Sequence, residues 1–145
     1  MINATLQALV KDMRDNIHRG NGYTFKPLIQ KGMHTFTRAN EPFIEVSAAG
    51  INLEITHGPG ASGELTVVIN AYSIARQQDN NDEGHMDLIE DILQYLYNDC
   101  VYKDNIEIIP EIPIEYGSLE GSTPVLASTF TIKIDLEYTF TEINN

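Results

Sequence analysis

The chain has little cysteine, no tryptophan and few basic residues. Its 145 residues include one cysteine, and nine Lys and Arg stand against 21 Asp and Glu. The single cysteine, Cys100, excludes an intrachain disulfide and fits a reducing compartment. The formal net charge of −12 disfavours direct binding to nucleic acid, because phosphates repel an acidic surface and the few cations are not clustered.

Long apolar runs and a leader sequence are also missing. No stretch approaches the ~18 apolar residues of a membrane span, so no membrane partner is expected. The N-terminus lacks the basic start, apolar run and small-residue cleavage site of a signal peptide. With 42% hydrophobic and 21% charged residues, the composition is that of an ordinary soluble protein. Its length predicts a single domain over residues 1–145.

The clearest positive signal is an alternation of apolar and polar residues near the C-terminus. It predicts a long antiparallel strand over 130–140 with one buried face and one wet face. The apolar face is formed by Phe130, Ile132, Ile134, Leu136, Tyr138 and Phe140.

Helical and strand patterns are both present upstream. Apolar residues recur at three- and four-residue spacing in 4–18 and 86–98, which predicts two amphipathic helices. Alternation predicts strands over 43–48, 51–55 and 65–75, and shorter β segments follow around 106–112. The sequence therefore predicts an α+β fold, in which two main helices pack on one face of a mostly antiparallel or mixed sheet.

A glycine-rich segment separates two of these strands. It reads His57-Gly58-Pro59-Gly60-Ala61-Ser62-Gly63. Three glycines and a proline in seven residues are not expected inside a sheet. We therefore expect a long β-hairpin with this segment as its Gly-rich tip, which projects from the core and becomes ordered against a partner.

One acidic stretch follows part of a calcium-binding loop pattern. Loop positions one, three, five, six and twelve hold Asp79, Asn81, Glu83, Gly84 and Glu90. Calcium needs several oxygen ligands, a glycine turn and a late bidentate carboxylate. Two features argue against calcium, because the fifth position is Glu rather than Asp or Asn and the preceding segment reads as a strand. The alternative is an acidic loop over 77–85 that leads into the first turn of a helix.

Signals for catalysis are absent. The four histidines, His18, His34, His57 and His85, form no i,i+3 or i,i+4 pair on a predicted helix, so no metal site is expected. No nucleophile motif or phosphate-binding loop is present. Cys100 follows an apolar helix and is expected to be a small buried residue. The chain is therefore predicted not to be an enzyme and to need no cofactor.

The order of these segments resembles a known family. An N-terminal helix leads to Pro42-Phe43-Ile44-Glu45-Val46, a strand over 64–72, a polar loop and the helix Asp87-Leu88-Ile89-Glu90-Asp91-Ile92-Leu93. The final strand ends Leu136-Glu137-Tyr138-Thr139-Phe140. The pattern, over about residues 4–140, resembles the tail terminator proteins (minor tail or tail-completion proteins) of long-tailed bacteriophages and related prophage elements.

The resemblance implies a structural role in a virion. Such proteins form a ring, usually a hexamer, which caps the tail tube, stops its polymerisation and provides the surface for head attachment. The implied partners are copies of this chain, a tail tube protein and a head-completion or connector protein. The implied location is the head-proximal end of the tail, and the host cytoplasm during assembly. Exposure and glycine content suggest partner contacts at Gly58, Pro59, Gly60, Gly63, Asp79 and Asp82.

Two other functions are compatible with the sequence. Another head–tail connector or neck protein would share its size, acidity and architecture. A calcium-modulated binding module would depend on the stretch from Asp79 to Glu90, and calorimetry with calcium would distinguish it.

Overall fold

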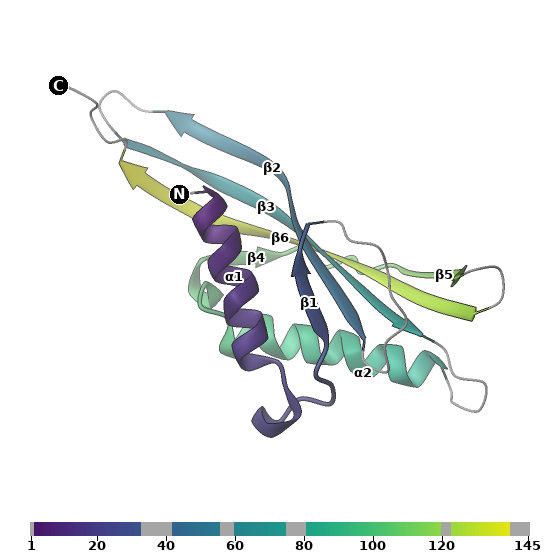
Figure 1. The fold of residues 1–145 in the computed structure, drawn as a ribbon. Helices are drawn as coiled ribbons and strands as arrows, with labels where there is room; N and C mark the ends of the chain where they lie inside the picture. Colours follow the sequence, from purple (N-terminus) through teal and green to yellow (C-terminus); the bar gives the residue numbers. More distant parts are fainter. Residues whose placement is uncertain (1, 33–41, 56–59, 75–80, 120–122, 140–145) are drawn as a thin grey trace.

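The computed structural model describes residues 2–32, 42–55, 60–74, 81–119 and 123–139. Figure 1 shows their arrangement. The helical elements are α1 (Ile2–Asn16), η1 (Arg19–Asn21), α2 (Asn81–Gln94), the π-helical turn η2 (Tyr95–Asp99) and η3 (Lys103–Asn105). The strands are β1 (Leu28–Lys31), β2 (Phe43–Ile55), β3 (Gly60–Ile74), β4 (Ile106–Ile108), β5 (Ile114–Leu119) and β6 (Thr123–Thr139).

The strands form one mixed sheet of six. Its order is β1-β2-β3-β6-β4, and β5 also pairs with β6. The pair β1–β2 is parallel, and every other pair is antiparallel. β3 is the central strand, because β2 and β6 pair along almost its whole length. The predicted α+β class with a mixed sheet is confirmed.

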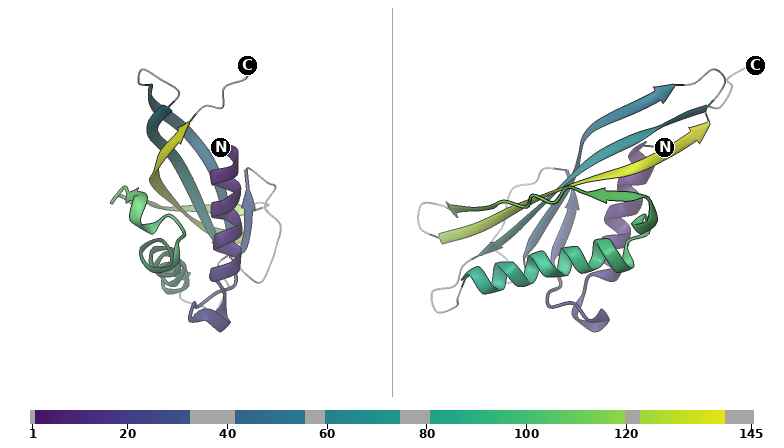
Figure 2. Two further views of the ribbon diagram at one scale, coloured as in Figure 1. Left: turned by 90° about the vertical axis from the view of Figure 1, so that its left-hand side faces the viewer. Right: turned by 180° about the vertical axis from the view of Figure 1, so that it is seen from behind.

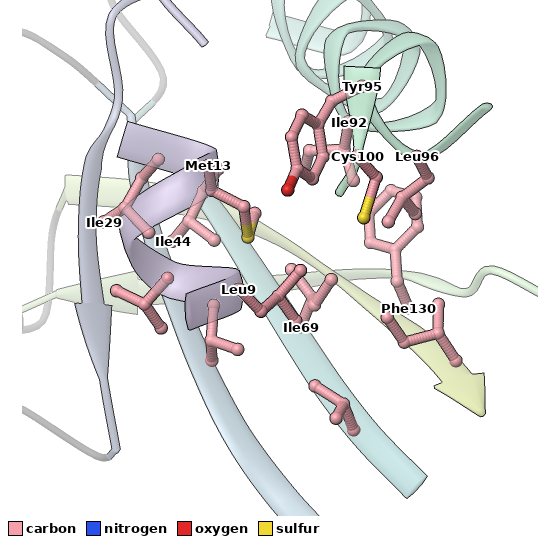
Figure 3. Close-up of a cluster of buried hydrophobic side chains, with 14 of the residues drawn as sticks. Leu9, Met13, Ile29, Ile44, Ile69, Ile92, Tyr95, Leu96, Cys100 and Phe130 are labelled. Atoms are coloured by element: carbon pink, nitrogen blue, oxygen red, sulfur yellow. The ribbon is translucent and has the colours of Figure 1, made fainter. Parts of the chain in front are cut away.

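Both helices pack on the same face of this sheet. Alternate residues of β2, β3 and β6 point to this face and join the buried stripes of α1 and α2 in one hydrophobic cluster. Figure 3 shows part of this cluster, with Leu9 and Met13 of α1, Ile92 of α2, Tyr95 of η2 and Ile69 of β3. The alternating apolar residues of the strands and the apolar residues at helical spacing therefore pack in a single core.

The second helix begins earlier than the sequence predicts. It starts at Asn81 rather than at Met86, so the second half of the expected acidic loop is the first turn of α2. The buried apolar stripe of α2 begins only at Leu88. The residues before it are mostly polar or acidic and show no regular spacing of apolar side chains. Periodicity alone cannot detect such a beginning.

The prediction of a loop through Gly63 is wrong. β3 begins at Gly60, and Gly63 lies in the central strand between Leu53 of β2 and Leu136 of β6. The reason is a close approach of two backbones. A Cβ atom at position 63 would lie 2.1 Å from the backbone oxygen of Asn52 and 2.9 Å from the Cα atom of Leu53. Glycine is needed here because the neighbouring strand occupies the space of a side chain.

Candidate interaction surface

The feature most suited to recognition is a three-stranded extension of the sheet, which we call the wing. It consists of Asn52–Ile55 of β2, Gly60–Glu64 of β3 and Asp135–Thr139 of β6. Figures 1 and 2 show that these strands continue past α2 and past the N-terminus of α1. β2 and β6 both run toward the tip of the wing, and β3 runs back from it.

One face of the wing is polar and acidic. Across the three strands, Asn52 lies beside Glu64 and Glu64 beside Asp135; in the next row Glu54 lies beside Ser62 and Ser62 beside Glu137. The six side chains include four carboxylates and no cation, and the nearest basic residue on this face is Lys133 of the preceding row. Like charges on neighbouring strands repel each other, so these carboxylates do not stabilise the sheet within one copy.

The same face is hollowed. A depression of about 670 Å³ is lined by Asn52, Glu54, Ser62, Gly63, Glu64, Asn105, Asp135, Leu136 and Glu137. Its lining is mostly polar and lacks the apolar walls typical of small-molecule pockets. The depression therefore has the character of a docking face rather than that of a substrate pocket.

A bulge in β2 separates the wing from the covered part of the sheet. Ala48 faces Val67 and Gly50 faces Thr66, so Ala49 is an extra residue on β2. A bulge bends its strand and increases the local twist. It therefore helps to set the direction in which the wing leaves the core.

Aspartates hold the helices to the rest of the molecule. Asp12 of α1 accepts hydrogen bonds from the Tyr95 hydroxyl (2.6 Å) and from the backbone N–H of Val101 (2.8 Å). Asp91 of α2 accepts the backbone N–H groups of Thr24 and Phe25, at 3.0 Å each. These contacts join segments far apart in sequence and satisfy buried polar groups.

One buried histidine lies between two serine hydroxyls, in an arrangement whose side chains are of the types used in catalysis. His85, which is 1% exposed, lies in the second turn of α2. Its Nδ1 atom is 2.6 Å from the Ser73 hydroxyl of β3, and its Nε2 atom is 2.7 Å from the Ser128 hydroxyl of β6. Ser128 is equally buried. The group connects α2 with β3 and β6 through two side-chain hydrogen bonds.

Several ionisable groups have shifted pKa values, and burial is the main cause. Burial, together with a hydrogen bond to Glu45 and the charge of that carboxylate, raises the pKa of Tyr72 to about 12. Burial also raises the pKa of Tyr95, aided by its hydrogen bond to Asp12, and the pKa of the Cys100 thiol. Each shift favours the neutral form, which is the opposite of what an activated nucleophile needs.

Comparison with known proteins gives only a distant structural similarity. No protein-family model and no curated protein matches the chain. One solved structure that it resembles is the cryo-EM structure of an extracellular contractile injection system, described as "PVC sheath/tube terminator in extended state". The identity is 9% and the TM-score 0.36, with 100% of this chain and 61% of that chain covered. The chain thus spans less than two thirds of the matched one, and a TM-score this low does not establish a shared fold.

The structure distributes the partner-contact residues predicted from sequence over two places. Gly60 and Gly63 are in the wing strand β3, and Asp82 is in the first turn of α2. Gly58, Pro59 and Asp79 lie outside the described residues. The sequence therefore indicated part of the wing, although it predicted a loop there rather than a paired strand.

The calcium candidates are not arranged as a loop where the structure describes them. Asn81, Glu83, Gly84 and Glu90 all belong to α2, and Glu83 and Glu90 are exposed. Within the described ranges, no three His, Cys, Asp or Glu residues form a group that could hold a metal ion. Those ranges also contain no helix long and apolar enough to cross a membrane.

Proposed function

We propose that this chain is a structural assembly protein that forms a closed ring on the end of a tail tube, in the manner of a tail terminator. The proposed partners are further copies of the chain, a tube protein and, on the other side of the ring, a head-completion or connector protein. The proposed chemistry is recognition alone, without catalysis or a cofactor.

The wing is the observation that carries this proposal. It extends three paired strands beyond the helices and presents a hollowed acidic face. A sheet that extends beyond its own core exposes backbone and side chains that do not contribute to that core. Such a surface is typical of proteins that assemble with a neighbour.

The order of elements in the sequence supports the same function. The helix, two strands, helix and long final strand that resemble tail terminators are present as α1, β2, β3, α2 and β6. The net charge of −12 keeps a concentrated assembly protein soluble and opposes premature association of single copies.

The experiment is to measure the mass in solution by light scattering, with and without an assembled tail tube, and to image the particles by negative stain. We expect a closed oligomer of the 16.2-kDa chain, about 100 kDa for six copies. If the ring needs the tube as a template, the free protein is a monomer and co-sediments with tubes, whose ends it caps. A monomer that neither binds tubes nor limits their length would refute the function.

A further inference from the structure

Among the strands that the structure describes, none pairs with the outer edge of β2 along most of its length. β1 pairs only with Phe43–Val46, and the structure describes no strand beside Ser47–Ile55 on that side. Ala48, Ala49, Gly50, Ile51 and Asn52 are exposed, and Ile51 retains 46% of its surface. An edge of this kind presents a row of backbone donors and acceptors to a neighbour.

This edge lacks most of the usual protection. Soluble proteins block long edges with lysine, proline or inward-pointing charges, but Ser47–Leu53 contains none of these. No charge between Ser47 and Leu53 therefore opposes the approach of a partner strand. Within Ser47–Leu53, the bulge at Ala49 is the one feature that hinders pairing with another strand. It lies before the wing, so the wing portion of β2 stays regular.

A second edge without a described partner strand lies on the opposite side of the wing. β4 pairs with β6 only at Ile132–Ile134. Past that point, no described strand lies beside the outer edge of Asp135–Thr139. This edge carries Asp135 and Glu137, so two copies of it placed together would repel each other. The edge of β2 carries one carboxylate, Glu54, between Ser47 and Ile55, so it repels the β6 edge less than a second β6 edge would.

We propose that the β2 edge of one copy pairs with the β6 edge of the next copy. The inference rests on the ring proposed above and assigns its subunit contact. Because β2 and β6 both run toward the tip, wings that point in the same direction around a ring pair in parallel. Such head-to-tail contacts pair the backbone groups of both edges of every copy. They form a closed ring when the rotation between neighbouring copies adds up to a full turn. A two-fold β2–β2 contact would leave both β6 edges open.

Disulfide trapping tests the pairing directly. Glu54 of β2 and Glu137 of β6 are exposed on the same face, so Glu54→Cys and Glu137→Cys do not disturb the core. A disulfide forms only where Cα atoms approach to about 4.4–6.8 Å. We expect the mixture of the two variants, each with one added cysteine, to form a mixed disulfide on mild oxidation, and Asp135→Cys tests an alternative register on β6. Natural Cys100 is 2% exposed and should not react.

The outcomes separate this contact from other arrangements. A Glu54→Cys homodisulfide without a mixed one would show two-fold β2–β2 pairing and overturn the proposal. Absence of any mixed disulfide from preparations that form rings would overturn the proposal but leave the ring function intact. A Glu90→Cys variant, exposed on α2, is the control for chance collision.

A lysine on the edge provides a second test. Ile51→Lys adds a charge to the open edge, and Met86→Lys makes the matched change on α2, where the exposure is 47% against 46%. We expect Ile51→Lys to weaken self-association at least tenfold while Met86→Lys leaves it unchanged, and both should keep the wild-type circular dichroism spectrum and melting temperature. Equal association of the two variants would overturn the proposal.

Discussion

At the residue scale, the wing depends most directly on the missing side chain of Gly63. The backbone of β2 occupies the space that a Cβ atom would need, with the Asn52 oxygen 2.1 Å from its position. We expect Gly63→Ala to lower the free energy of unfolding by roughly 1–3 kcal/mol, because the two strands must separate to admit the methyl group. Urea unfolding followed by circular dichroism measures this change.

Gly117 of β5 is the matched control for that substitution. It is also a strand glycine, but nothing lies within 4 Å of a Cβ atom built on it. Gly117→Ala should therefore leave stability unchanged or raise it slightly, since alanine restricts the unfolded chain. Equal losses at both positions would show that close approach is not the reason for glycine at position 63.

Cys100 is predicted to be an inert thiol whose titration affects stability at alkaline pH. Burial raises its pKa above the ordinary value of 9.0. The unfolded chain therefore releases this proton at a lower pH than the folded chain, so stability is complete below about pH 8.5 and falls as pH rises above it. Between pH 7 and pH 9.5, the wild type should lose more stability than Cys100→Ala, as measured by urea unfolding.

A thiol reagent provides an independent check on Cys100. In native protein at pH 8 the thiol should react orders of magnitude more slowly than in urea, because only the exposed thiolate attacks the reagent. Rapid reaction in the native state would contradict the burial of Cys100.

At the scale of elements, periodicity in the sequence predicted the helices and strands that bury one regular face. Alternation located β6, and three- and four-residue spacing located α1 and the later turns of α2, because these segments bury one regular face. The Gly60–Gly63 part of β3 was mispredicted, since Gly63 admits the close backbone of β2 and does not form a local turn. The contact of His85 with Ser73 and Ser128 was also missed, because no local pattern relates residues 12 and 43 positions apart.

The bulge in β2 gives an element-scale prediction. Ala48 and Gly50 face consecutive residues of β3, so deletion of Ala49 restores a regular ladder without moving any pair. We expect this deletion to change the free energy of unfolding by less than about 1 kcal/mol. Because the local twist falls when the bulge is removed, the wing should change direction and self-association should weaken.

Deletion of Val68 in β3 is the contrasting case. It would shift half of the central strand against both neighbours, and a one-residue slip exchanges the two faces of a strand. We expect this variant to be unfolded in far-ultraviolet circular dichroism. Equal damage from both deletions would mean that Ala49 is not a spare residue.

At the scale of the whole molecule, charge opposes assembly while the proposed strand contacts favour it. Every copy carries a formal charge of −12, and four of its carboxylates lie on the wing face beside the proposed contact. Backbone hydrogen bonds between edges are neutral and depend little on salt, whereas repulsion between copies is screened over about 10 Å at 0.1 M ionic strength. Assembly should therefore strengthen as salt rises.

Sedimentation velocity at fixed protein concentration tests this balance. Between 20 mM and 300 mM NaCl, we expect the oligomer fraction to rise, and a variant with Glu54→Gln and Glu137→Gln to assemble better than wild type at low salt. The salt effect should shrink in this variant, because two of the repelling charges have been removed. If salt instead dissociates the oligomer, ion pairs hold the copies together, and backbone pairing along the β2 edge would not be the main contact.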